Sequence, residues 1–297
     1  MLLTLLATLA YARELELETI RVGGVDRTFY VHEPPGRARD LPLVLVFHGG
    51  GGWGSEKGKG IARLTELAAL ADEQHFRVVF PNSVSGNWND GRVFDGAATA
   101  DDIGFVDAIL AHFASTTDAT RIYATGASNG GFFTLRLACE RADRFAAFAP
   151  VIATLPTTLE CKPSRPVSVM FVPGTKDPWV HWDGGTVANQ RGSSRSVEET
   201  LRIFSEVDRC PPAPEARLLP DTDPNDGTRV RETRTDCADG SEIVLLAVEG
   251  GGHTWPGGFQ YLPESIIGPT SHDIEASAEI WKFFSAHTLR VAPPPAP

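Results

Sequence analysis

The sequence has no basic stretch and no apolar segment long enough to cross a membrane. Its 297 residues include 27 Lys and Arg against 38 Asp and Glu, a formal net charge of -11 at pH 7. A chain this acidic, without clustered basic residues, is unsuited to nucleic acid or to an anionic membrane surface. The apolar run at residues 2–9 falls short of the roughly 20 residues that span a bilayer. We therefore expect neither nucleic acid nor membrane as a partner.

Cysteine is scarce, and its spacing does not suit a metal. The four cysteines, Cys139, Cys161, Cys210 and Cys237, form no CxxC pair and no Cys/His ligand spacing, so we expect no metal and no cofactor. An even count in an exported chain predicts two disulfides, with buried free thiols as the alternative. Of the three possible pairings, Cys139–Cys161 and Cys210–Cys237 are favoured because sequence neighbours close small local loops.

Internal repeats and long linkers are also missing, which favours a single domain. Residues 2–9 are followed by Ala10-Tyr11-Ala12, a small-x-small pattern typical of a signal-peptide cleavage site, although no basic residues precede the run. We expect a signal peptide over residues 1–12, a secreted or periplasmic domain over residues 13–290, and a disordered Pro-rich tail over residues 291–297. A buried strand or helix is the alternative for the N-terminal run.

Apolar strand patterns alternate with amphipathic helix patterns along the chain. This alternation predicts an α/β fold, namely one mostly parallel sheet of about eight strands with helices on both faces. Ligand sites in such sheets form at the carboxyl ends of the strands. The expected buried strands are 41–50, 76–82, 121–126, 145–151, 166–174 and 242–250, the edge strands 16–22 and 28–33, and the helices 56–74, 101–115, 129–142, 196–208 and 272–287.

Ser128 is the centre of Gly126-Ala-Ser-Asn-Gly130, which fits G-x-S-x-G between an expected strand and an expected helix. A turn this tight needs small residues around the serine, and it projects the hydroxyl above the sheet. The N-terminal N–H groups of the following helix favour negative charge developing there. The pattern predicts a nucleophile. A Gly-rich turn without catalysis is the alternative.

A serine hydroxyl needs a base, and His253 is the candidate among the eight histidines. It lies in EGGGHTWPGG, directly after the last expected strand, where glycines give it a bare, adaptable loop. The orienting acid is expected between Ser128 and His253 in the chain. Asp177 follows another buried strand, and Asp183 is the second choice. Each residue of the triad thus follows a different strand of one sheet.

The oxyanion of the tetrahedral intermediate needs two N–H donors. Asn129, the residue after the nucleophile, is expected to supply one through its backbone. The run His48-Gly-Gly-Gly-Gly52 after the strand LVLVF matches an HGGG-type oxyanion loop, in which Gly50 is favoured and Gly51 is the alternative. Glycine lets the backbone approach a substrate closely.

Tryptophans lie near these loops in the sequence, at Trp88, Trp179 and Trp255. We expect them to line a substrate cleft as a platform for an aromatic acyl group, with simple loop packing as the alternative. A second pattern, DTDPNDGTRVRE, puts Asp221, Asp223, Asn225 and Glu232 at EF-hand offsets, but Asp226 replaces the required glycine. D-P-N-D-G instead predicts a hairpin turn.

The assembled motifs resemble those of the secreted polyhydroxybutyrate depolymerase and feruloyl esterase group. They are FHGGGG, WNDGR at 88–92, DDIGFVDAIL, RIYATGASNGGFF, GTKDPWV and GGGHTWPGG, spread over residues 41–258. The resemblance implies an α/β-hydrolase fold and serine carboxylesterase activity, and it carries nucleophile, acid and base onto Ser128, Asp177 and His253. It also implies a disulfide between Cys210 and Cys237.

The glycine-rich oxyanion loop resembles the feruloyl-esterase branch more than the polymer depolymerases. Depolymerases of this group often have cysteine after His-Gly and alanine after the nucleophile, where this chain has Gly50 and Asn129. The expected substrate is a hydroxycinnamoyl ester of plant cell-wall polysaccharide such as xylan. A polyhydroxybutyrate depolymerase is the first alternative. An acyltransferase or a non-catalytic surface binding protein on the same fold is the second.

Overall fold

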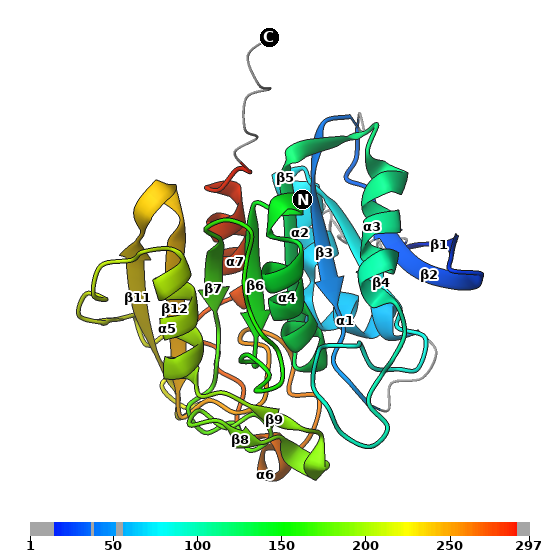
Figure 1. The fold of residues 1–297 in the computed structure, drawn as a ribbon. Helices are drawn as coiled ribbons and strands as arrows, with labels where there is room; N and C mark the ends of the chain where they lie inside the picture. Colours follow the sequence, from blue (N-terminus) through cyan, green and yellow to red (C-terminus); the bar gives the residue numbers. More distant parts are fainter. Residues whose placement is uncertain (1–14, 37–38, 52–55, 290–297) are drawn as a thin grey trace, which may run out of the picture.

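The computed structural model describes residues 15–36, 39–51 and 56–289. Its main feature is one ten-stranded sheet in the order β1-β2-β4-β3-β5-β6-β7-β12-β11-β10 (Figure 1). The strands are β1 (Glu16–Val22), β2 (Val25–His32), β3 (Leu41–Phe47), β4 (Arg77–Pro81), β5 (Thr117–Ala127), β6 (Ala147–Val151), β7 (Ser168–Phe171), β10 (Arg217–Leu218), β11 (Arg229–Asp236) and β12 (Glu242–Glu249).

The centre of this sheet is parallel and its two edges are antiparallel. Neighbouring strands from β4 across to β12 run parallel, whereas β1, β2, β10 and β11 pair antiparallel. The mostly parallel α/β sheet expected from the sequence is therefore confirmed. It has ten strands rather than about eight because the hairpin formed by β10 and β11 joins the sheet, with β11 pairing along the whole of β12.

Helices cover both faces, and the central strands divide their side chains between two cores. Along β3, Leu43 and Leu45 face one core, while Val44 and Val46 face the other, as the two-residue period of a strand dictates. The first core takes side chains from α3 (Asp102–Phe113), α4 (Asn129–Glu140) and α5 (Val197–Val207), and the second from α1 (Lys57–Thr65), α2 (Leu67–Gln74) and α7 (Ala276–Ser285).

The single helix expected over 56–74 is in fact two. Glu66 adopts a left-handed conformation, with φ 50°, and its N–H bonds to the carbonyl of Ala62, which ends α1. Helix α2 starts at the next residue. No glycine or proline marks this break in the sequence, and both short helices pack side chains into the second core. The expected helix over 272–287 likewise begins only at Ala276.

Two disulfides fasten helix ends to neighbouring segments. Cys139 near the end of α4 pairs with Cys161, and Cys210 after α5 pairs with Cys237 after β11. This is the pairing that local loop closure favours. No helix in the described ranges combines the length and the apolar character that a bilayer span requires. The expected signal peptide at 1–12 and the Pro-rich tail at 291–297 lie outside the described residues.

The parallel strands run toward the edge of the molecule at which the β8–β9 hairpin and α6 lie (Figure 1). This hairpin consists of β8 (Gly185–Thr186) and β9 (Ser193–Ser194), joined by the 3-10 turn Ala188–Gln190, and α6 spans Glu264–Ile267. The loops that carry Ser128, Asp177 and His253 follow β5, β7 and β12. The parallel register thus brings residues far apart in the sequence to one edge of the sheet.

Candidate active site

Ser128 lies at the junction of β5 and α4 with a backbone that few residues adopt. Its φ of 55° and ψ of -120° are strained for a residue with a side chain, and such strain persists only where the surroundings enforce it. The Ser128 N–H donates to the carbonyl of Val151 at 3.0 Å. A Cβ on Gly130 would lie 2.1 Å from the carbonyl oxygen of Phe47, so only glycine fits there. The G-x-S-x-G pattern therefore reflects close packing of α4 on the sheet.

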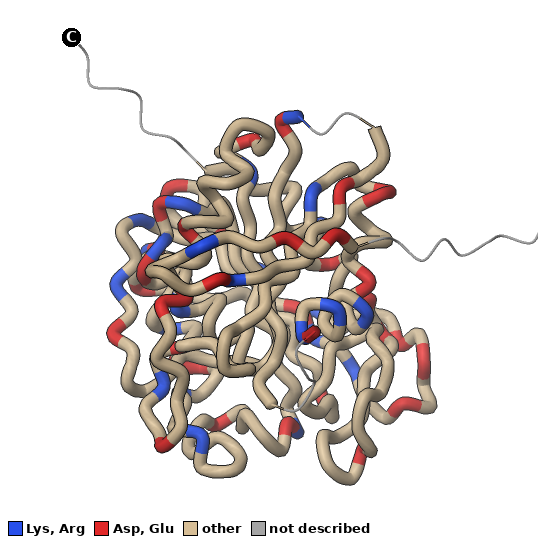
Figure 2. The backbone as a smooth tube through the Cα atoms, turned by 90° about the vertical axis from the view of Figure 1, so that its right-hand side faces the viewer, with Lys and Arg blue, Asp and Glu red and all other residues tan. Residues whose placement is uncertain are grey.

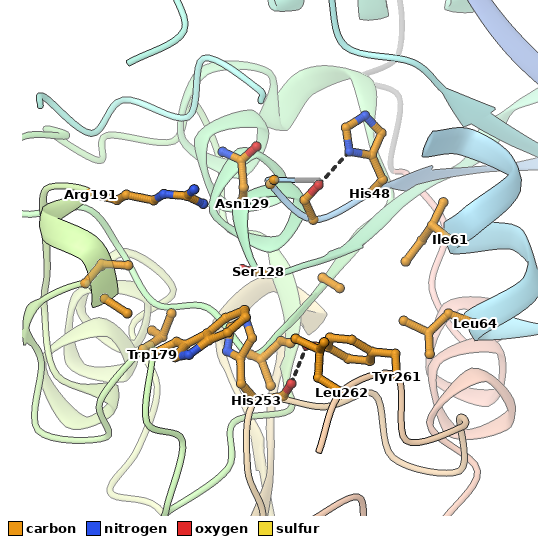
Figure 3. Close-up of a pocket in the computed structure, with 18 of the residues that line it drawn as sticks. His48, Ile61, Leu64, Ser128, Asn129, Trp179, Arg191, His253, Tyr261 and Leu262 are labelled. Atoms are coloured by element: carbon orange, nitrogen blue, oxygen red, sulfur yellow. Dashed lines mark hydrogen bonds between the residues drawn. The ribbon is translucent and has the colours of Figure 1, made fainter. Parts of the chain in front are cut away.

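His253 follows β12 and is 1% exposed. Its Nδ1 lies 2.7 Å from Oδ2 of Asp177. Its Nε2 is buried, and no described residue offers that atom a hydrogen-bond partner. His253 and Ser128 line the same pocket (Figure 3). A neutral imidazole that donates from Nδ1 to the carboxylate presents Nε2 as an acceptor, which is what a general base requires.

The loop around His253 is tightly packed rather than adaptable, which corrects the expectation from its glycines. A Cβ on Gly252 would lie 2.0 Å from the carbonyl oxygen of Ile267. The His253 N–H donates to that same carbonyl, and the Tyr261 hydroxyl donates to the His253 carbonyl at 2.6 Å. Glycine is needed here because two backbones meet, and the contact fixes the imidazole.

Asp177 is held as firmly as its partner. Its Oδ1 accepts from the backbone N–H groups of Trp179 at 2.8 Å and Val180 at 2.9 Å, which leaves Oδ2 for His253. Both oxygens of the buried Asp177 carboxylate, in the T-K-D-P turn, thus accept hydrogen bonds. Asp183, the second choice from the sequence, is exposed and lies in the turn closed by the Gly184 N–H and the His181 carbonyl.

The glycine loop after β3 packs against the start of α4. A Cβ on Gly49 would lie 3.6 Å from the Ser128 Cβ, and one on Gly50 would lie 2.4 Å from Oδ1 of Asn87. Among the described residues, no hydrogen-bond acceptor is found for the backbone N–H of Gly50 or of Asn129. These two groups, expected as oxyanion donors, border the pocket beside Ser128.

The neutral imidazole of His48 holds the glycine loop in place through two hydrogen bonds. Its Nδ1 donates to the Gly49 carbonyl at 2.7 Å, and its Nε2 accepts from the Ser83 N–H at 3.2 Å. Burial lowers the pKa of His48 to about 3, despite the opposing effect of the Gly49 hydrogen bond. His48 is therefore uncharged at neutral pH.

Sequence reasoning missed the side-chain role of Asn129. Its amide accepts from the Trp88 N–H at 2.7 Å and donates to the Trp88 carbonyl at 3.1 Å and to Asp90 Oδ2 at 2.6 Å. Arg92 donates three hydrogen bonds to Asp90, one from its backbone N–H and two from its guanidinium, and it donates to the Arg191 carbonyl at 3.0 Å. The WNDGR segment therefore joins the serine turn to the loop that carries Arg191. Polar residues in a short Gly-containing loop were the only available signal.

The pocket has a volume of about 540 Å³, and Trp179 is the only one of the three expected tryptophans that lines it. The Trp179 ring lies 4.9 Å from the His253 ring. Trp88 and Trp255 are each 1% exposed and belong to the cores, so the expectation that they line the cleft is wrong. Trp88 stacks on Phe133, so its large apolar ring is buried in the core although the residue lies in a loop.

The EF-hand-like pattern forms a turn and part of a strand. The Asp226 N–H donates to the Asp223 carbonyl at 3.2 Å, as the hairpin reading expects. Asp226 accepts from Thr228, and Glu232, on β11, pairs with Arg217 and Arg234. These side chains face separate partners rather than one point. Across the described ranges, no group of three His, Cys, Asp or Glu side chains is arranged to hold a metal ion.

Several known proteins that resemble this chain in sequence are esterases. Feruloyl esterase B of Piromyces equi is 28% identical over 76% of this chain and 42% of its own length. Poly(3-hydroxyalkanoate) depolymerase C of Paucimonas lemoignei is 30% identical over 41% of this chain and 30% of its own. The chain thus spans less than half of either relative. NocK of Nocardia uniformis subsp. tsuyamanensis, named as a candidate esterase, is 30% identical over 86% of this chain and 78% of its own.

The chain belongs to the same family of serine esterases as NocK. Residues 84–160, which include the serine turn, also match the model of the prolyl oligopeptidase family. The solved structure of acetyl xylan esterase from Aspergillus awamori superposes with a TM-score of 0.56 at 16% identity, over 91% of this chain and 99% of that one. At that identity the likeness establishes the α/β-hydrolase fold of this esterase.

Proposed function

We propose that this esterase hydrolyses carboxylic esters through an acyl-enzyme on Ser128. The observation that carries the proposal is the buried His253–Asp177 hydrogen bond, which leaves Nε2 of His253 without a described partner in the pocket that Ser128 lines. The Ser128 hydroxyl attacks the ester carbonyl while Nε2 takes its proton. Nε2 then returns that proton to the departing alcohol. Water attacks the acyl-enzyme by the same route and releases the acid.

Asp177 and the glycine loop support the charges that form during this reaction. Asp177 holds the imidazole in the tautomer with Nδ1–H and stabilises the imidazolium. The backbone N–H groups of Asn129 and Gly50 bind the oxyanion, each contributing about 3 kcal/mol in comparable sites. The tight packing of Gly50 on Asn87 supports this role, because a fixed donor loses no reorganisation energy when charge develops.

The acyl group we propose is hydroxycinnamoyl, as in feruloyl esters of plant polysaccharide. Feruloyl esterase B of Piromyces equi and the apolar pocket side chains Ile61, Leu64 and Leu262 favour it, together with the Trp179 ring. Polyester hydrolysis is the second candidate, favoured by the depolymerase relative. Initial rates on methyl ferulate, hydroxybutyrate oligomers and acetylated xylan separate the candidates. The two disulfides support secretion to an oxidising compartment.

Substitution of the nucleophile tests the proposal. Ser128→Ala is expected to lower kcat on methyl ferulate and on a p-nitrophenyl ester by at least about 10³-fold and to abolish labelling by a fluorophosphonate. Ser285→Ala, at the exposed end of α7, is the matched control and should retain both the wild-type kcat and the fluorophosphonate labelling. An unlabelled wild-type enzyme, or a Ser128→Ala variant with its rate intact, would overturn the assignment. Added alcohol acceptors in the same assay reveal any acyl transfer.

A further inference from the structure

Two of the three cations that line the pocket have no carboxylate partner among the described residues. Arg92 is buried and paired with Asp90, so its charge is balanced within the protein. Lys57 and Arg191 also line the pocket, yet the described residues provide neither with an ion-pair partner. Along the backbone as a whole, acidic and basic residues are interspersed, with acidic residues in excess (Figure 2).

Lys57 and Arg191 are close enough to affect each other. The pKa of Lys57 is lowered, first by burial and then by the positive charge of Arg191. The Lys57 ammonium donates to the carbonyl of Gly86, next to Asn87, which packs on Gly50. Two like charges beside the oxyanion loop oppose each other, so a bound anion would lower the energy of both.

The loop that carries Arg191 is fixed by its backbone. The Arg191 N–H donates to the Val187 carbonyl at 3.2 Å, and Arg92 donates to the Arg191 carbonyl at 3.0 Å. The guanidinium lies beside the glycine loop, since its Nη1 is 3.7 Å from where a Cβ on Gly51 would stand. It points into the pocket toward Asn129 (Figure 3). A guanidinium on an anchored backbone is suited to bind a carboxylate with two parallel hydrogen bonds.

The opposite side of the pocket is apolar. Figure 3 shows Ser128 between Arg191 on one side and Ile61 and Leu64 of α1 on the other. An ester bound at Ser128 has two halves, which extend away from the carbonyl in different directions. If the acyl half is the aromatic group of the proposed function, it fits the apolar side, and the alcohol half then faces Arg191.

We propose that this esterase selects esters whose alcohol half carries a carboxylate, which Arg191 binds with support from Lys57. The inference rests on the proposed function and names its substrate class more closely. An acidic sugar in a polysaccharide and the free end of a polyester both present this chemistry. The protein's net charge of -11 repels anionic substrates in general, so the local cations are needed to admit them.

Matched ester pairs test this selection. The first pair is 4-carboxyphenyl acetate and its methyl ester, which differ by a charge in the alcohol half. The second pair is 4-nitrophenyl hydrogen adipate and 4-nitrophenyl hexanoate, which differ by a charge in the acyl half. The quantity measured is the ratio of kcat/KM for the charged ester to kcat/KM for the neutral one. Intrinsic reactivity cancels when this ratio is compared between enzyme variants.

Arg191→Gln is expected to lower the first ratio by about tenfold, the effect of one lost charge-assisted interaction, while Arg191→Lys keeps most of it. Lys57→Gln is expected to lower it less. Arg231→Gln, on the exposed face of β11, is the control for removing a charge far from the pocket and leaves the ratio unchanged. Rising salt should reduce the wild-type ratio as well, which tests the idea even if Arg191→Gln fails to fold.

An unchanged first ratio in folded Arg191→Gln overturns the inference, as does a charge preference confined to the acyl pair. Hydroxybutyrate dimer and feruloylated acidic oligosaccharide, each compared with its carboxyl methyl ester, then distinguish the two sources of the anion. Failure here is separable from failure of the proposed function. If Ser128→Ala abolishes hydrolysis of every ester while Arg191→Gln changes no ratio, the serine mechanism stands and only the charge selection is wrong.

Discussion

The imidazole of His253 and the carboxylate of Asp177 lie 2.7 Å apart, atom to atom, although 76 residues separate them in the chain. Both side chains are 1% exposed. The contact forms because β7 and β12 are parallel neighbours and end at the same edge of the sheet. A hydrogen bond this well shielded from water fixes the orientation of the imidazole that donates it.

Asp177→Asn is predicted to abolish most activity while leaving the fold in place. The amide oxygen can still accept from the Trp179 and Val180 N–H groups, so its NH₂ group faces Nδ1 of His253. The imidazole then keeps its proton on Nε2 and cannot act as a base. We expect kcat on a p-nitrophenyl ester to fall about 10³–10⁴-fold, with an unchanged circular dichroism spectrum.

Asp183→Asn is the control for this change, because Asp183 is the neighbouring carboxylate of the same loop and is exposed. Its activity should stay within about twofold of wild type, as is usual for a surface substitution. If Asp183→Asn were the inactive variant and Asp177→Asn the active one, the proposed orienting role of Asp177 would be wrong.

The order of elements and the edge at which Ser128, Asp177 and His253 meet could be predicted from the sequence. The reason is general, since buried parallel strands are continuous apolar runs and their carboxyl ends share one edge. In the sequence, only the position of Asp177 directly after a buried strand favours it over Asp183 as the partner of His253. Their contact depends on a turn in which two N–H groups orient one carboxylate.

Features that depend on tertiary packing were not predictable. Trp88 and Trp255 stand beside site motifs in the sequence but pack into the two cores, since sequence proximity does not determine which face a ring takes. The break at Glu66 has no local signal. In the sequence, the glycines before His253 predict an adaptable loop, whereas in the structure Gly252 lets two backbones approach closely. Such contacts form between segments whose distance in the folded protein cannot be derived from the sequence.

Asn129→Ala is predicted to affect stability more than catalysis. The side chain makes three buried hydrogen bonds to Trp88 and Asp90, and the substitution leaves the Trp88 N–H without its acceptor. We expect a loss of about 2–3 kcal/mol in the free energy of unfolding, measured with urea. Because the backbone N–H at position 129 remains, kcat should fall by less than about tenfold, against 10²–10³-fold for a lost oxyanion donor.

Asn225→Ala, in the exposed turn at 223–226, should change the free energy of unfolding by no more than about 0.5 kcal/mol. A large drop in kcat for Asn129→Ala without loss of stability would contradict this division of roles. It would instead show that the side-chain amide contacts the reacting atoms.

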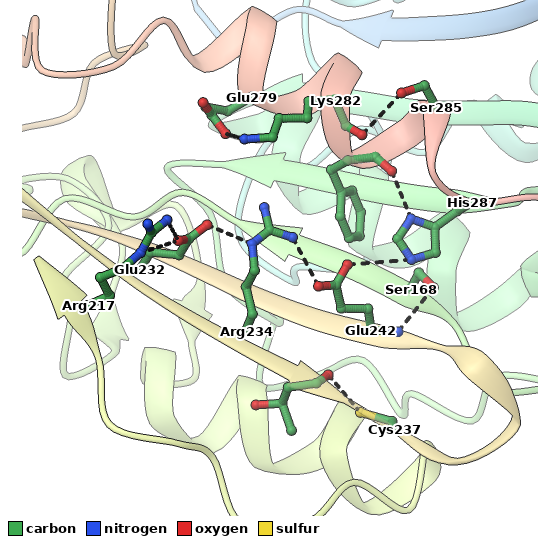
Figure 4. A network of polar contacts seen from close by, with 12 residues as sticks. Ser168, Arg217, Glu232, Arg234, Cys237, Glu242, Glu279, Lys282, Ser285 and His287 are labelled. Carbon is green, nitrogen blue, oxygen red and sulfur yellow. Dashed lines mark hydrogen bonds and ion pairs between the residues drawn. The ribbon is translucent and has the colours of Figure 1, made fainter. Parts of the chain in front are cut away.

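Glu232 is predicted to make stability depend on pH. It is 6% exposed on β11 and pairs with both Arg217 and Arg234, while Arg234 also pairs with Glu242 (Figure 4). Burial alone raises the pKa of Glu232, but the hydrogen bonds from the two arginines outweigh it, and the pKa lies below the usual 4.5. The folded state therefore favours the charged form more than the unfolded state does.

The sign of the effect follows from this lowered pKa. The stabilisation is fully present above the unfolded-state pKa of 4.5, and it is lost as pH falls through the lower folded-state pKa. The free energy of unfolding of Glu232→Gln should therefore be about 1–3 kcal/mol lower than that of the wild type near pH 7. This difference should become smaller below pH 4.5. Glu206→Gln removes an exposed i,i+4 pair with Arg202 and should cost at most about 0.5 kcal/mol. Urea unfolding of both proteins at pH 3.5, 5 and 7 tests this prediction. A difference in the free energy of unfolding that is constant over that range would mean that Glu232 acts through packing and not through its charge.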